Sequence, residues 1–384
     1  MIINTMPKLI DKCRMYLSMQ HCTRHRTLYF RLLISLFLST NAYLFLFPIT
    51  NEYRPFHLSF KKTNSVADRI VLLVRTSHNC ESRLNYLLQS WISTDVLEQS
   101  NLYLITDRLS NSANLTLFSS FQNVIQTGCP ETHDRNDLCC KTAHEFNLFY
   151  NLILTKPNLE WLCRFDDDHY VNIKNLYKYL SQINASKSYY MGRTSISGRL
   201  RASNSIRSYS FATYGAGVCF SHALLKQLRP HVHIKNLPVD CLKHRLSDDA
   251  YIGYLIECIL NVSLTARNDL FHSHLEKLET SFRYFNLNHL SDSITFGFAW
   301  DRYKLDWLPI IHELIQLTNR GQIKTASRLW LFLRNYEKEH PENLKDKYDE
   351  SCISHQRLRN QSIEVHTSKT RKSIETLKQH NETG

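Results

Sequence analysis

Short apolar stretches alternate along the chain with segments in which apolar residues recur every three or four positions. The short stretches are rich in β-branched and aromatic residues and predict buried strands, at residues 70–74, 102–106 and 161–165. The segments with helical spacing predict helices, at residues 82–92 and 140–154. Because strands and helices alternate, the pattern predicts an α/β fold with a largely parallel sheet.

The longest apolar segment lies near the N-terminus, at residues 32–47 (LLISLFLSTNAYLFLF), and carries no formal charge. Six Lys and Arg residues precede it with one acid, Asp11, whereas Asn51 and Glu52 follow it, so the positive-inside bias predicts a cytosolic N-terminus. A cleaved signal peptide is the alternative, but its apolar core usually lies nearer the start. We therefore expect a single-pass type II membrane protein whose short anchor, residues 32–48, favours the endoplasmic reticulum or Golgi.

This anchor divides the chain into five parts. We expect a cytosolic tail at residues 1–31, the anchor at 32–48, a stem at 49–66, a globular domain at 67–335 and a polar, mobile tail at 336–384. Composition supports a globular domain, because 43% of the residues are hydrophobic and only 21% are charged. Wholesale disorder is excluded.

Charge and cysteine usage narrow the class of protein. The 47 Lys and Arg exceed the 35 Asp and Glu, giving +12, but no run of five basic residues concentrates that charge, so no nucleic-acid partner is expected. Nine cysteines follow the anchor and none forms a Cys-x-x-Cys pair, which favours scattered disulfides over a zinc ribbon. Luminal exposure also fits five glycosylation sequons, at Asn114, Asn184, Asn261, Asn360 and Asn381.

Three consecutive carboxylates, Asp166 to Asp168, follow the strand predicted at 161–165. Open α/β sheets bind ligands at the carboxyl ends of their strands. Asp166 and Asp168 point to the same side of an extended segment, and adjacent carboxylates suit Mg²⁺ or Mn²⁺, which also hold substrate phosphates. The alternative is a solvated acidic turn that caps a helix starting near Asn172.

Three further segments carry candidate chemistry. Ser247-Asp248-Asp249 stands at the start of a predicted helix, where an acid is either a helix-dipole partner or a general base for a sugar hydroxyl. Phe271-His272-Ser273-His274 offers two imidazoles that are either metal ligands or packed side chains. Residues 211–219 (FATYGAGVC) contain two glycines, which permit either close approach to a ligand or tight packing.

Together these segments resemble the Fringe glycosyltransferases, β-1,3-N-acetylglucosaminyltransferases that extend O-linked fucose on EGF-like repeats of Notch-type receptors. The resemblance is carried by WLCRFDDDHYVN at 161–172, FATYGAGVCFS at 211–221, SDDAYIGYLIE at 247–257 and LFHSHLEKL at 270–278, and more weakly by residues 74–92. It implies a glycosyltransferase A type nucleotide-sugar-binding fold, UDP-N-acetylglucosamine as donor, Mn²⁺ as cofactor and a Golgi location.

The resemblance also implies residue roles. Asp168 and His274 would ligate Mn²⁺, Asp249 would be the catalytic base, and Thr76, Arg83, Asp166 and Asp167 would bind the nucleotide sugar. Cys129 would pair with Cys140, and Cys163 with Cys219.

The chain also departs from the family pattern. Tyr214-Gly215 replaces Gly-Gly, and Ala250 replaces a cysteine, so a family disulfide is absent or replaced through Cys241. Two alternatives remain open: another β-1,3-glycosyltransferase, such as a core-1-type galactosyltransferase, and a non-catalytic luminal chaperone derived from such an enzyme.

Overall fold

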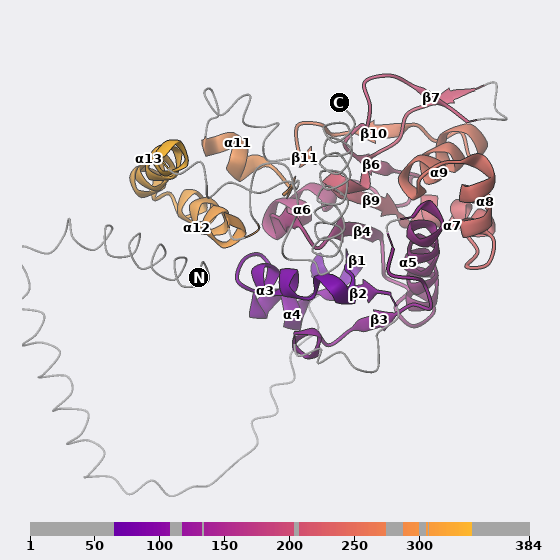
Figure 1. Cartoon of the computed structure of the whole chain (residues 1–384), viewed down its shortest axis with the longest axis horizontal. Coiled ribbons are helices and arrows are strands. Elements are labelled where there is room, and N and C mark those ends of the chain that lie inside the picture. The colour runs from indigo at the N-terminus through magenta and orange to yellow at the C-terminus, as the bar shows by residue number, and fades with distance from the viewer. Residues whose placement is uncertain are drawn as a thin grey trace, which may run out of the picture. The chain divides into compact units, whose positions relative to one another are not determined.

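A computed structural model describes the chain at residues 65–107, 117–132, 134–202, 207–273, 287–298, 305 and 307–339 (Figure 1). All of these belong to the second of two contact units, residues 64–384. Within the described part, no helix is both long and apolar enough to cross a membrane. The expected cytosolic tail, anchor and most of the stem lie outside the described residues, as do residues 340–384.

A seven-stranded sheet forms the centre of the described unit, in the order β10-β6-β9-β4-β1-β2-β3. Its strands are β1 (Ile70–Arg75), β2 (Asn101–Thr106), β3 (Val124–Gln126), β4 (Trp161–Asp166), β6 (Tyr190–Gly192), β9 (Val218–Ser221) and β10 (Leu264–Ala266). Neighbouring strands are parallel except at β9, which runs antiparallel to both β4 and β6. The α/β class and the largely parallel sheet are therefore confirmed.

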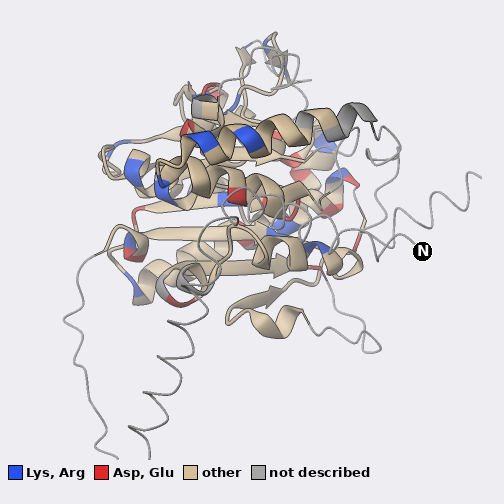
Figure 2. Ribbon diagram, turned by 90° about the vertical axis from the view of Figure 1, so that its left-hand side faces the viewer, with Lys and Arg blue, Asp and Glu red and all other residues tan. Residues whose placement is uncertain are grey.

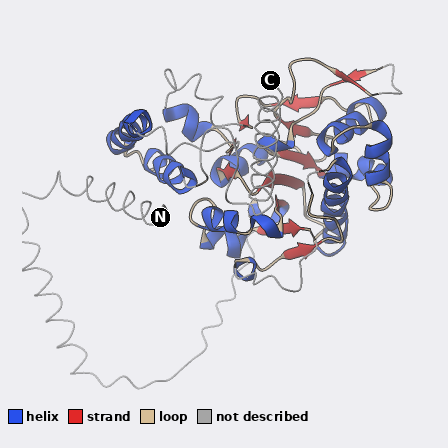
Figure 3. Cartoon of the chain, in the orientation of Figure 1, coloured by secondary structure: helices blue, strands red, loops and turns tan. Residues whose placement is uncertain are grey.

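Helices cover both faces of this sheet (Figure 3). The helices are α3 (Ser82–Leu88), α4 (Thr94–Gln99), α5 (Arg135–Thr155), α6 (Ile173–Leu180), α7 (His222–Leu228), α8 (Leu237–His244) and α9 (Asp248–Tyr254), with a π-helical turn, η6, at Leu255–Ile259. Alternating residues of β1 and β4, such as Val71, Leu73 and Leu162, join residues of α5 and α7–α9 in one buried cluster. This packing fixes α5 and α9 against the face of the sheet.

A smaller sheet stands beside the acidic triplet. Its order is β11-β12-β5, with β5 at His169–Val171, β11 at Phe271–His272 and β12 at Thr295–Gly297. Beyond it come α11 (Leu287–Asp292), α12 (Trp307–Asn319) and α13 (Ile323–Glu339), and α12 also contacts α3. The helix α13 continues four residues past the expected domain boundary at 335.

The remaining short elements connect these layers. They are the 3₁₀ turns η1 (Ala67–Arg69), η2 (His78–Cys80), η3 (Phe118–Ser120), η4 (Tyr214–Ala216) and η5 (Arg229–His231), and the hairpin strands β7 (Leu200–Arg201) and β8 (Ser208–Tyr209). Acidic and basic residues are interspersed over the described helices and connections (Figure 2). Two disulfides implied by the family resemblance, Cys129–Cys140 and Cys163–Cys219, are present.

Candidate active site

The site lies at the carboxyl ends of the neighbouring parallel strands β1 and β4. Arg75 and Asp166 are register partners at the last position of these strands. Thr76 therefore follows one strand and Asp167-Asp168 the other at the same edge of the sheet. This is the edge at which open α/β sheets bind ligands, as the sequence predicted.

Asp167 is the member of the acidic triplet whose carboxylate is held by hydrogen bonds from neighbouring elements. Thr76 donates its hydroxyl proton to Oδ2 at 2.8 Å, and the Arg83 guanidinium at the start of α3 donates to Oδ1 at 2.6 Å. Burial raises the pKa of Asp167 to about 6, although Arg83 and Thr76 oppose that rise. The structure thus brings Thr76, Arg83 and Asp167 together, with both carboxylate oxygens of Asp167 held by protein.

Asp166 and Asp168 form the more accessible part of the triplet. Their side chains are 29% and 26% exposed, and together with His169 they place three ligand atoms within 4.8 Å of one another. Carboxylate oxygens are suitable donors for Mn²⁺ or Mg²⁺, whereas Nδ1 of His169 also accepts the backbone N–H of Asp166 at 3.1 Å. The carboxylates of Asp166 and Asp168 therefore fit a divalent cation.

His169 was not among the expected ligands. It begins β5, is almost fully buried, and places Nδ1 3.1 Å from Oδ1 of Asp168. Burial lowers its pKa, but the hydrogen bond and charge of Asp168 outweigh burial, so the pKa is raised. The sequence signal was present, since His169 directly follows the triplet. The expected ligand His274 lies outside the described residues.

The second acidic pair opens α9, as predicted. Ser247 Oγ and the Ala250 backbone N–H donate to Oδ1 of Asp249, at 2.6 and 2.7 Å. Among the described residues, none donates a hydrogen bond to its Oδ2. Burial, followed by the negative charge of Asp248, raises the pKa of Asp249 to about 6. Asp249 is therefore a partly exposed carboxylate with one oxygen fixed and a pKa suited to proton transfer.

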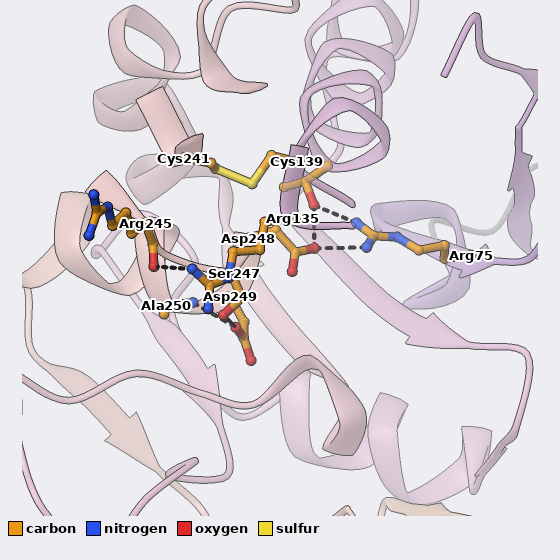
Figure 4. The surroundings of a disulfide bond; sticks show 10 residues. Arg75, Arg135, Cys139, Cys241, Arg245, Ser247, Asp248, Asp249 and Ala250 are labelled. Atoms are coloured by element: carbon orange, nitrogen blue, oxygen red, sulfur yellow. Dashed lines mark hydrogen bonds and ion pairs between the residues drawn. A yellow bond between two sulfur atoms is a disulfide. The ribbon is translucent and has the colours of Figure 1, made fainter. Parts of the chain in front are cut away.

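Asp248 has the opposite environment. Its Oδ2 accepts from Arg75 Nη1 at 2.7 Å and from the Thr142 hydroxyl on α5 at 2.8 Å (Figure 4). Burial would raise its pKa, but the charges of Arg75 and Arg164 outweigh burial and lower it. Two adjacent carboxylates thus have pKa values shifted in opposite directions, a pattern found in acid–base sites.

A third disulfide, Cys139–Cys241, fixes the approach to this pair. It joins α5 to α8, and Figure 4 shows it beside the loop that leads to Ser247. Arg135 Nη1 donates to the Arg245 carbonyl at 2.8 Å, where the chain adopts a left-handed conformation at the end of α8. Cys241 therefore takes part in a bridge, which is one of the two alternatives left open by the missing family cysteine at Ala250, and its partner is Cys139.

A second potential metal cluster is excluded by chemistry. Cys129, Cys140 and His144 lie within ligand distance of one another, but both cysteines are in a disulfide and cannot act as thiolates. Asp166, Asp168 and His169 are thus the cluster that the described residues offer to a cation.

Tyr214, the residue that departs from the family's Gly-Gly pattern, is buried. Its ring is 4% exposed and lies under the Arg164 guanidinium, 4.3 Å from the ring centroid. The departure from the Gly-Gly pattern therefore places an aromatic ring against a buried cation of β4.

A protein-family comparison matches the part of the chain that contains the central sheet and both acidic clusters. The family model described as Fringe-like matches residues 65–313. The chain belongs to this family. It is 37% identical over 221 residues to the β-1,3-N-acetylglucosaminyltransferase lunatic fringe of Danio rerio, covering 56% of each chain.

Two other relatives give similar values. The radical fringe β-1,3-N-acetylglucosaminyltransferase of Gallus gallus is 32% identical over 229 residues, 58% of each chain. The Fringe glycosyltransferase of Drosophila melanogaster is 31% identical over 253 residues, 62% of this chain and 58% of the relative. The chain thus matches somewhat more than half the length of these curated relatives.

Among solved structures, a galactosyltransferase in complex with donor and acceptor sugar analogs aligns with a TM-score of 0.39 and 9% identity. That alignment covers 64% of this chain and 94% of the other. The similarity is too low to support an argument about fold or function.

Proposed function

We propose that this protein transfers N-acetylglucosamine from UDP-N-acetylglucosamine in β-1,3 linkage to O-linked fucose on EGF-like repeats of Notch-type receptors. The observation that carries the proposal is the pairing, in a Fringe-like chain, of an acidic triplet at the end of β4 with a raised-pKa carboxylate at the start of α9. Relatives named β-1,3-N-acetylglucosaminyltransferases support the reaction type. We further propose a glycosyltransferase A type fold and a Golgi location through the N-terminal anchor.

The reaction is a single displacement with inversion. As the 3-hydroxyl oxygen of the acceptor sugar attacks C1 of the donor sugar, its proton passes to Oδ2 of Asp249. The bond between C1 and the oxygen of UDP breaks on the opposite face, and the bonding electrons leave with UDP. Because the base and the leaving group act on opposite faces, the configuration at C1 inverts.

The acidic triplet serves the leaving group. Asp168 and His274 would hold Mn²⁺, and the bound cation would supply positive charge to the departing diphosphate. Asp166 and Asp167 would bind the nucleotide sugar or keep its site in shape, and Thr76 and Arg83 hold Asp167 in place.

The test is UDP release by the full-length protein in detergent micelles, with Mn²⁺ and a panel of UDP-sugars. Acceptors are an O-fucosylated EGF-like repeat, the same repeat without fucose, and a peptide carrying O-linked N-acetylgalactosamine. The proposal expects release from UDP-N-acetylglucosamine that is stimulated only by the fucosylated repeat. Preference for UDP-galactose and the N-acetylgalactosamine peptide would replace it with the core-1-type reaction. A folded protein inert with every pair would favour the chaperone alternative.

A further inference from the structure

The buried guanidinium of Arg75 lies in a charge network that connects the Asp248-Asp249 pair to the acidic triplet. Arg75, at the end of β1, is 6% exposed and uses all three guanidinium nitrogens. Nε donates to Glu145 Oε1 at 2.5 Å, Nη1 to Asp248 at 2.7 Å, and Nη2 to the Thr142 hydroxyl. One side chain therefore connects the central sheet to α5 and to the first turn of α9.

The connection continues to the acidic triplet. Glu145 lies 3.5 Å from Arg164 Nε through its second oxygen, and Arg164 Nη2 donates to Asp166 Oδ1 at 2.7 Å. Arg164 is buried and is covered on one face by Tyr214. Charges thus alternate from Asp248 to Asp166 through two arginines and one glutamate.

The same dipeptide serves both halves of the site. Arg75 holds Asp248, the residue before the proposed base, while Thr76 holds Asp167, the residue before Asp168. A shift of either side chain would move the base relative to the triplet. Because a displacement of about 1 Å can cost 100-fold in rate, this is a sensitive linkage.

We propose that Arg75 is the positioning residue that holds the base Asp249 and the acidic triplet in one fixed geometry. It acts through Asp248 on one side and through Glu145 and Arg164 on the other. The inference rests on the proposed transfer reaction and goes beyond it, since Arg75 is assigned no contact with substrate. A buried ion network is weak evidence for stability on its own, so the test must separate positioning from folding.

The polar and titratable groups that face Asp248 and Asp249 come from several elements. They are Arg75 on β1, Thr142 and Glu145 on α5, Arg164 on β4, Tyr190 on β6, Tyr209 on β8, Tyr214 on η4 and Ser247 before α9. The pKa values of the three tyrosines are raised by burial, so these side chains are neutral where Asp249 titrates. Arg75 and Arg164 are the cations of this set.

The experiment compares the full-length wild-type protein with Arg75→Met, Arg75→Lys and Asp248→Asn. Arg69→Met is the matched control, because Arg69 flanks the other end of β1 and pairs with Glu160 at a partly exposed site. Steady-state UDP release gives kcat, the donor KM and the pH of half-maximal kcat. Carboxyl ¹³C signals of Asp-labelled protein give the midpoint for Asp249, whose signal is identified by its loss in Asp249→Asn.

Arg75→Met should lower kcat by about 100-fold with a donor KM within threefold of wild type, because the base is misplaced but donor contacts remain. Loss of Arg75 also shifts the Asp249 midpoint, because Arg75 keeps the pKa of Asp248 low and the charge of Asp248 raises the pKa of Asp249. Asp248→Asn should move it to lower pH, because the charge that raises the Asp249 pKa is gone. Arg75→Lys restores the charge and should return the midpoint to that of wild type.

The inference would be overturned if Arg75→Met had the same kcat and the same Asp249 titration midpoint as the control Arg69→Met. If Arg75→Met does not fold, Asp248→Asn and Arg75→Lys decide, and an unchanged midpoint in Asp248→Asn would reject it. A wild-type protein without transferase activity would refute the proposed function alone. The ¹³C midpoints of Asp249 in Arg75→Met and Asp248→Asn would still test the linkage to Arg75.

Discussion

At the scale of single residues, the chemistry depends on how two neighbouring aspartates differ. Asp248 is buried and its Oδ2 accepts from both Arg75 and Thr142, whereas Asp249 is less buried and its Oδ2 has no donor among the described residues. Because a base must be a carboxylate to accept a proton, activity should rise with pH through the Asp249 pKa of about 6. We expect kcat/KM at pH 5 to be about tenfold below its plateau near neutral pH.

Replacing the base separates catalysis from binding. Asp249→Asn should reduce kcat by about 10²–10⁴-fold, the usual contribution of general base catalysis. The affinity for UDP, measured by calorimetry with Mn²⁺, should stay within threefold because Asp249 is not part of the triplet. Asp134→Asn, an exposed position before α5, is the control. Unchanged turnover by Asp249→Asn would remove it from the mechanism.

The proposed metal ligands can be tested by binding measurements that need no turnover. Asp168→Asn and His274→Ala should each weaken Mn²⁺-dependent UDP binding by tenfold or more, about 1.4 kcal/mol, because each removes one donor to the cation. His233→Ala, in the exposed loop before α8, should leave binding unchanged. If His169→Gln abolished metal binding and His274→Ala had no effect, the histidine ligand would be reassigned to the position beside the triplet.

At the scale of secondary structure elements, the disulfide between α5 and α8 is the main covalent constraint near the base. Cys139–Cys241 spans 102 residues and Cys129–Cys140 spans 11. In the chain-entropy model, the longer loop restricts the unfolded chain more strongly, by about 2 kcal/mol.

Replacing Cys139 and Cys241 together by serine should therefore lower the free energy of unfolding by about 2 kcal/mol more than replacing Cys129 and Cys140. Urea denaturation of both double variants measures this difference. The first variant should also lose kcat, because α8 leads directly to Ser247 and Asp249. Equal losses of stability in the two variants would show that the α5–α8 bridge adds no special constraint.

The hydrophobic pattern predicted those strands that form one continuous apolar run in the sequence. The strand at 70–74 and the strand at 161–165 each appear within one residue of the predicted bounds, because each is a continuous apolar run. The short strands β6 and β9 were not predicted, since three or four residues give too little periodicity. Helix α5 starts at Arg135 rather than Cys140 because its first turn is polar.

At the scale of the whole molecule, the sequence located the two acidic clusters but not the residues that hold them in place. Asp249 and the triplet follow recognisable motifs, and the structure brings Thr76 and Arg83 to Asp167 as a group. The Arg75 network depends on contacts across 70 and 173 residues, which no local pattern encodes. A signal existed nevertheless, because Arg164 is a charge inside an otherwise apolar strand, where burial requires a partner.

A titratable contact joins α12 to β5, beside the acidic triplet. On α12, His312 places Nδ1 3.1 Å from the hydroxyl of Tyr170, which follows His169 in β5. Burial, and then the charge of Arg320, lowers the pKa of His312 to about 4. His312 therefore stays neutral in the folded protein at pH values where it is already protonated in the unfolded chain, whose histidine pKa is about 6.5.

This difference should make the protein less stable as the pH falls from about 6.5 towards 4, because the unfolded chain binds more protons there. Between pH 7 and pH 5, the wild type should lose roughly 1–2 kcal/mol more than His312→Gln. Urea denaturation of both proteins at the two pH values measures the difference, and His144 and His169 contribute equally to each. A His312→Gln protein with the same pH dependence as wild type would show that α12 stays packed on β5 whatever the charge of this imidazole.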